Sequence, residues 1–286
     1  MDGETVLAEA AQSYRYALGE RLIAAYALGS LAHGGFSPLV SDIDLGLVVS
    51  DPVRVEDAAT IQAIAGREKA KGSPLHERIS VFWGTPATLR GDSDGGRFPP
   101  LDRLDLIESG RRLFGSDEER ASLPRPSADE LLLTGAQFAL EYLAGIRVDL
   151  APDNELGSMR PGGDDAVEEI HRPEMLLARG VRRVTKLVLF PVRFLYTAAS
   201  GQAGTNGAAV AHYVKDEEAP SRPLVVAALE WRTAAPSDEE AAAELLRKQM
   251  VPLYLHFIDD HIRRLSSLAE TRLVDAFGEW RDRLVG

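Results

Sequence analysis

The sequence contains no cysteine, so disulfides, thiolate metal sites and thiol catalysis are all excluded. Any nucleophile or metal ligand must therefore be an oxygen or nitrogen atom. The sequence also lacks the run of about 18 apolar residues that a membrane-spanning helix needs. Its first residues, Met1-Asp2-Gly3-Glu4, lack the basic start and apolar core of a secretory signal. We therefore expect a soluble, cytoplasmic protein with no membrane partner.

Basic residues are also fewer than acidic residues. The 286 residues include 32 Lys and Arg against 44 Asp and Glu, which gives a formal net charge of -12. Affinity for nucleic acids comes largely from clustered Lys and Arg that displace counterions from phosphates. We therefore expect no nucleic-acid partner. The hydrophobic fraction of 45% and the charged fraction of 27% are typical of a folded globular protein.

The first part of the chain alternates apolar strands with amphipathic helices, a pattern typical of an α/β domain. We expect this domain to end about Gly115. The expected helices cover residues 4–21, 54–71 and 101–113, and the expected strands cover 22–28, 42–49 and 78–83.

The second part predicts a helical bundle that follows a polar linker over residues 116–127. Ser127 with Glu130, and Ser237 with Glu240, have the spacing of capping boxes at helix starts. We expect a helix over 180–199 that Pro191 kinks or divides, and a final helical stretch that Pro252 interrupts. Residues 149–173 are rich in Gly, Pro and acidic residues and predict a long surface loop.

Two short motifs in the first domain point to chemistry. Asp42 and Asp44 lie two apart on a predicted strand, so both carboxylates face the same side while Ile43 faces the core. Two such charges repel, and a cation between them offsets that cost. Oxygen ligands with room for water suit Mg²⁺, which binds through carboxylates and substrate phosphates. Upstream, Gly29 and Ser30 end the first strand in a tight turn that can approach and bind a phosphate.

The pattern of Gly29-Ser30 followed by Ser41-Asp42-Ile43-Asp44 resembles the signature of the polymerase-β-type nucleotidyltransferase superfamily. Within it, the layout resembles the aminoglycoside adenylyltransferases of the streptomycin and spectinomycin type. The stretch 104–115 is similar to the helix that closes their first domain, and 196–201 is similar to a Tyr-Thr-x-x-Thr-Gly stretch in their bundle.

This resemblance implies a nucleotidyltransferase domain over 1–115 with a small mixed sheet (α+β), a linker over 116–127 and a helical bundle over 128–286. It also implies a Mg²⁺-dependent transfer of AMP from ATP to a hydroxyl of a small molecule, an aminoglycoside in this family, with release of pyrophosphate. Antibiotic resistance would then be the physiological role.

The resemblance also assigns the site residues. Asp42, Asp44 and a third acid, Glu77, would hold the metal and act in catalysis. The nucleotide contacts would come from the remaining motif residues, Gly29, Ser30 and Ser41.

Two departures from the family pattern leave alternatives open. Glu77 shares a face with Ile79 and Val81 only if the strand begins early, whereas the third acid is missing if the family position falls on Ser80. The family's Lys after the Thr-Gly stretch is also absent. Lys186, Arg182 or Arg193 could substitute for it, or could be cations on a solvated helix face.

Two other functions are alternatives to the small-molecule transferase. One is a nucleotidyltransferase that modifies a protein partner, as in toxin–antitoxin systems. The other is a nucleotide-binding regulatory protein with degraded catalysis.

Overall fold

The structure is a computed structural model that describes residues 2–148 and 166–286. Its chain divides into two compact units, the first ending at Pro126 and the second beginning at Ser127. Among the described residues, no helix is both long and apolar enough to cross a membrane.

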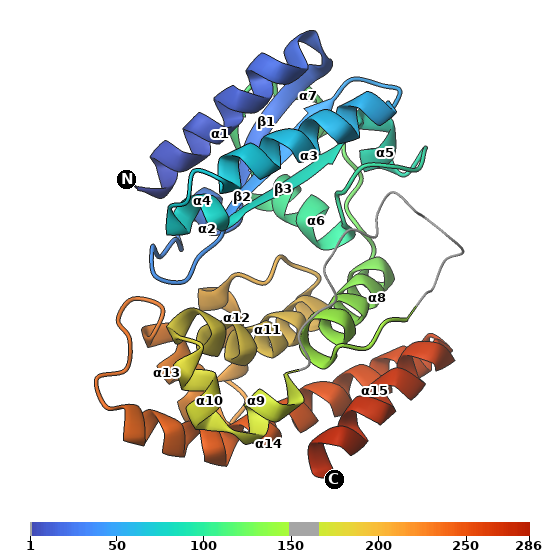
Figure 1. Cartoon of the computed structure of the whole chain (residues 1–286). Helices are drawn as coiled ribbons and strands as arrows, with labels where there is room; N and C mark the ends of the chain where they lie inside the picture. The colour runs from blue at the N-terminus through green and yellow to red at the C-terminus, as the bar shows by residue number, and fades with distance from the viewer. Residues whose placement is uncertain (1, 149–165) are drawn as a thin grey trace. The chain divides into compact units, whose positions relative to one another are not determined.

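The first unit is built around one four-stranded sheet (Figure 1). Its elements in chain order are α1 (Gly3–Leu18), η1 (Gly19–Arg21), β1 (Leu22–Leu28), α2 (Gly29–His33), β2 (Ile43–Val49), α3 (Val55–Lys69), α4 (Pro74–Glu77), β3 (Ile79–Gly84), α5 (Pro86–Arg90), α6 (Pro100–Ser109), β4 (Arg111–Phe114) and α7 (Glu118–Ala121).

The sheet is mixed, with the strand order β3-β2-β1-β4. β1 pairs antiparallel with both β2 and β4, whereas β2 pairs parallel with β3. The two central strands are almost fully buried, as their continuous apolar runs predict. The small mixed sheet that the resemblance implies is therefore present.

Each face of the sheet has its own apolar core, because successive strand residues face opposite sides. On one face, α1 and α3 pack over residues such as Ala27, Leu45 and Val81. On the other face, Leu106 of α6 joins a smaller cluster that includes Leu28 of β1. In Figure 1, α1 and α3 lie in front of the strands.

The second unit is all helical. Its described elements are α8 (Ala128–Ala139), η2 (Leu140–Ala144), α9 (Val167–His171), α10 (Pro173–Ala178), α11 (Val181–Ser200), α12 (Asn206–Tyr213), α13 (Arg222–Glu230), α14 (Glu239–Ser267) and α15 (Thr271–Val285).

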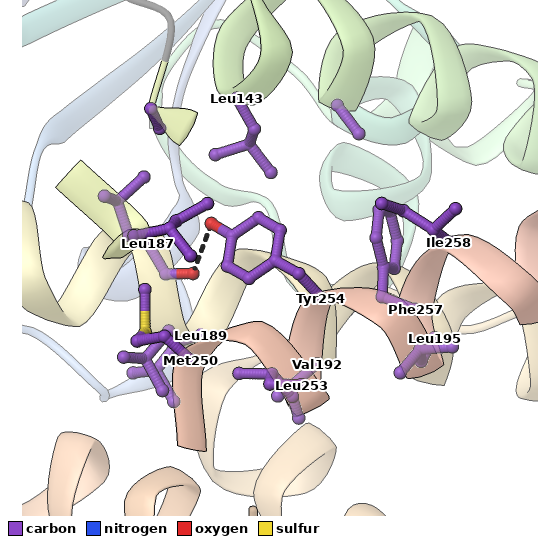
Figure 2. Packing of buried hydrophobic residues seen from close by; sticks show 14 of the residues in the cluster. Leu143, Leu187, Leu189, Val192, Leu195, Met250, Leu253, Tyr254, Phe257 and Ile258 are labelled. Carbon is purple, nitrogen blue, oxygen red and sulfur yellow. Dashed lines mark hydrogen bonds between the residues drawn. The ribbon is translucent and has the colours of Figure 1, made fainter. Parts of the chain in front are cut away.

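The core of this unit forms where α11 packs against α14 (Figure 2). Leu187 and Val192 of α11 are buried against Tyr254 and Phe257 of α14. Both helices continue through an internal proline, Pro191 in α11 and Pro252 in α14. Tertiary packing therefore keeps each helix continuous through a proline, a residue that would break or kink an isolated helix.

Most expected elements are present, and their boundaries differ by a few residues. The strand expected over 22–28 is confirmed as β1, and Ser127 caps α8 in the expected box with Glu130. The helix expected over 101–113 ends instead at Ser109, where Gly110 follows and the chain turns into β4.

Several expectations for the second unit are wrong. Pro252 does not interrupt α14, and the break comes at residues 268–270. Asp238 and not Ser237 caps that helix, accepting the N–H of Ala241 at 2.9 Å. The loop expected over 149–173 falls mostly outside the described residues, and its described end contains α9.

Candidate functional site

Asp42 and Asp44 stand where the central strand β2 begins. Asp44 is the second residue of β2, and Asp42 lies one residue before the strand. Both are half-buried, whereas Ile43 between them is fully buried in the core under α1 and α3. This alternation agrees with the expectation that the two carboxylates lie on the opposite face from Ile43.

Gly29 lies beside Asp44 because of the pairing between β1 and β2. Leu28, the last residue of β1, pairs with Asp44, and Gly29 follows it at the start of α2. The Asp44 carboxylate approaches so closely that a Cβ on Gly29 would collide with its Oδ2. Gly29 also has a φ of +57°, a left-handed conformation that residues with a side chain rarely adopt. Both features require glycine at this turn.

The backbone amide of Gly29 is held by a second carboxylate. Its N–H donates a hydrogen bond of 2.5 Å to Oδ2 of Asp105, which lies on α6. Asp105 is not among the site residues expected from the sequence. The spacing of acidic residues on α6 gives no sign of this contact, because it joins residues 76 positions apart.

Ser80, and not Glu77, stands next to Asp44 on the neighbouring strand. β3 begins at Ile79, and its parallel register pairs Asp44 with Ser80. Glu77 is the exposed last residue of the short helix α4, which Ser73 caps and Pro74 starts. The early strand start that would bring Glu77 onto the sheet does not occur. A metal-binding role for Glu77 stays a prediction without support from its position.

Ser41 shapes the loop that leads into Asp42. It is buried, its N–H donates to the carbonyl of Ser37 at 2.9 Å, and its Oγ accepts the Ser37 N–H at 3.0 Å. Arg78 holds the same loop by donating from Nη1 to the carbonyls of Pro38 and Leu39, at 3.0 and 3.1 Å. These bonds fix the backbone before Asp42. They give Ser41 a structural role, and its expected contact with a nucleotide stays a prediction.

The cations named as substitutes for the family's Lys lie on α11 in the second unit. Lys186 and Arg193 flank the ring of Phe190 at 5.9 and 5.6 Å from its centroid. Arg193 also donates from Nε to the carbonyl of Gly204, just beyond the stretch 196–201 that ends α11. Arg232, which the sequence analysis did not single out, has its pKa lowered by burial and by the charge of Arg193.

The donor set at β2 fits Mg²⁺ bound by two carboxylates. Asp42 and Asp44 offer oxygen ligands only, and Mg²⁺ usually takes one or two carboxylates together with water and substrate phosphates. Across residues 2–148 and 166–286, no three His, Asp or Glu residues are grouped as a metal site. A Mg²⁺ ion held by Asp42 and Asp44 would therefore take its remaining ligands from substrate and solvent.

Comparisons with known proteins support the fold. No protein-family model and no curated protein matches the sequence. Among solved structures, the chain is similar to spectinomycin adenyltransferase AAD(9) from Enterococcus faecialis, whose crystal structure contains ATP and spectinomycin. The similarity covers 86% of this chain and 98% of the other, with a TM-score of 0.51 and 14% sequence identity. The chain thus shares the fold of that adenyltransferase.

Proposed function

We propose that this chain is a Mg²⁺-dependent nucleotidyltransferase that transfers AMP from ATP to a hydroxyl group of a small molecule. The observation that carries the proposal is the close approach of the Asp44 carboxylate to the Gly29 turn. Asp44, a proposed metal ligand, thus lies next to the turn proposed to bind phosphate, at one end of the two central strands, in the fold of an adenyltransferase. The expected cytoplasmic location would supply ATP.

Each residue of the site has a distinct part in this proposal. Asp42 and Asp44 would hold Mg²⁺, which when bound spreads the negative charge that develops on the phosphates. Because the Gly29 N–H donates to Asp105, the neighbouring Ser30 would bind the phosphate. The half-buried position of Ser30 leaves part of its surface accessible.

The net reaction exchanges one phosphorus–oxygen bond for another. The acceptor oxygen forms a bond to the α-phosphorus of ATP, and the bond from that phosphorus to the β-phosphate oxygen breaks. Pyrophosphate leaves with the electron pair, and the proton of the acceptor hydroxyl is released to solvent. Positioning and charge stabilisation account for most of the catalysis of such reactions.

An aminoglycoside is the acceptor we favour, because the similar adenyltransferase was crystallised with ATP and spectinomycin. The net charge of -12 would attract a polycationic acceptor of that kind. The same charge suits a basic protein surface, so AMP transfer to a protein partner is an alternative acceptor class.

A second candidate function is nucleotide binding without efficient turnover, as in a regulatory protein. The observation that favours it is Ser80, which stands opposite Asp44 where a third carboxylate would complete the site. A chain of this kind would keep Mg²⁺ and ATP affinity through Asp42 and Asp44 and lose the rate of transfer.

The experiment that tests the proposal measures pyrophosphate release from ATP and Mg²⁺ with a panel of aminoglycosides. Asp42→Asn and Asp44→Asn should each abolish acceptor-dependent release. Asp92→Asn is the matched control, because Asp92 is 63% exposed and pairs with Arg90 on the surface. Tight Mg-ATP binding without release for any small acceptor would favour the protein acceptor or the regulatory function. No nucleotide binding at all would contradict the proposal.

A further inference from the structure

Asp105 connects α6 to the turn that carries the proposed site. Its Oδ2 accepts a hydrogen bond from the backbone N–H of Gly29, at 2.5 Å. The helix α6 is fixed in place, because Leu104 and Leu106 on either side of Asp105 are fully buried. The carboxylate is therefore held against the turn by the packing of a whole helix.

Gly29 is consequently enclosed by two carboxylates from different elements. Asp105 of α6 accepts its N–H, while Asp44 of β2 fills the space where a side chain would begin. The first contact fixes the peptide plane between Leu28 and Gly29. Gly29 has a left-handed φ of +57° at this turn, and in that conformation a Cβ would collide with the Asp44 carboxylate.

We propose that Asp105 is a positioning residue for the nucleotide site, an inference that rests on the proposed function. It does not contact the reacting atoms. It holds the Gly29 turn so that Ser30 faces the phosphates and the Asp44 carboxylate keeps its place.

Two substitutions separate the hydrogen bond from the charge. Asp105→Ala removes the acceptor and should weaken binding of Mg²⁺ with a non-hydrolysable ATP analogue by about tenfold or more, the usual loss for a hydrogen bond to a charged group. Asp105→Asn keeps an oxygen acceptor and should bind within about threefold of the original protein. Glu108→Gln is the control on the same helix, because Glu108 is exposed and pairs with Arg125.

A second measurement reports the contact without nucleotide. In the NMR spectrum of the isotope-labelled free protein, the Gly29 amide proton should resonate downfield, as expected for an N–H that donates to a carboxylate. Asp105→Ala should shift it upfield, and Glu108→Gln should leave it unchanged. If Asp105→Ala is too unstable to study, the smaller upfield shift expected for Asp105→Asn serves the same purpose.

The outcomes distinguish this inference from the proposed function. Equal nucleotide binding by the original protein and Asp105→Ala would overturn the positioning role and leave the proposed function intact. An unmoved Gly29 amide would also overturn it. Weak binding by Asp105→Ala that Asp105→Asn restores would support it, because a merely structural role predicts no such restoration. Absence of nucleotide binding in the original protein would overturn both.

Discussion

The phenolic hydroxyl of Tyr254 on α14 donates a hydrogen bond of 2.8 Å to the backbone carbonyl of Leu187 on α11 (Figure 2). Leu187 lies four residues before Pro191, so its carbonyl would normally accept the N–H of residue 191. Proline has no N–H, and the Tyr254 hydroxyl takes its place. Burial raises the pKa of Tyr254, which keeps the hydroxyl protonated as a donor.

Replacing Tyr254 by Phe should therefore leave the Leu187 carbonyl buried without its partner. We expect the free energy of unfolding to fall by about 1 to 3 kcal/mol, the cost of such an unsatisfied group. In a Pro191→Ala background, the alanine N–H can bond to Leu187, and Tyr254→Phe should cost much less. Denaturant unfolding of the two single variants and the double variant measures this coupling. If the changes in unfolding free energy of the two single variants simply add in the double variant, the hydroxyl does not stand in for the N–H that Pro191 lacks.

Substitution of Gly29 tests the turn of the proposed site. Gly29→Ala should abolish nucleotide binding, because the new Cβ collides with Asp44 and the left-handed backbone costs about 1 to 2 kcal/mol more. Gly34→Ala is the matched control. Gly34 also has a positive φ, of +85°, but nothing lies within 4 Å of an added Cβ.

The comparison separates conformational strain from the collision. Both variants should lose some stability in thermal unfolding, and only Gly29→Ala should lose binding of Mg²⁺ and ATP. Equal binding by the two variants would mean that the close approach of Asp44 is not needed.

The stability of the second unit should depend on His261. This side chain of α14 is 1% exposed and packs against Phe257 and against Phe277 of α15. Burial lowers the pKa of His261 from 6.5 to about 4. Asp260 and Arg264 are its charged neighbours. Between pH 6.5 and 4 the unfolded chain binds a proton that the folded chain does not.

The contribution of neutral His261 is therefore fully present above pH 6.5 and is lost as the pH falls towards 4. A shift of this size corresponds to about 3 kcal/mol. His261→Phe should remove this part of the pH dependence of unfolding, and replacement of the exposed His212 by Phe should not. The same curve for His261→Phe and the original protein would contradict the prediction.

The sequence correctly predicted those elements that a local pattern specifies. The apolar run 22–28 became β1, and Ser127 and Glu130 formed their capping box. β4 was missed, because Arg111–Phe114 is a short and partly exposed segment whose pairing with β1 is made far away in the sequence. Periodicity alone extended the preceding helix through it.

The candidate site was predictable to the same extent. Asp42, Asp44 and Gly29 could be found because each lies in a short motif whose spacing has a physical meaning. The Asp105–Gly29 contact depends on how α6 packs under the sheet, and the choice of Ser80 over Glu77 depends on where β3 begins. Both are consequences of tertiary structure, which local patterns do not determine.

Ser80 offers a direct test of the metal site. Ser80→Asp would add a third carboxylate opposite Asp44, and the repulsion should lower the melting temperature by a few degrees without metal. Mg²⁺ should restore the lost stability, since a cation offsets the repulsion between the acids. Ser80→Asn, similar in shape and uncharged, should show no such Mg²⁺ dependence. Thermal unfolding with and without Mg²⁺ measures the difference, and a melting temperature of Ser80→Asp that ignores the metal would mean that Asp44 does not face a cation site.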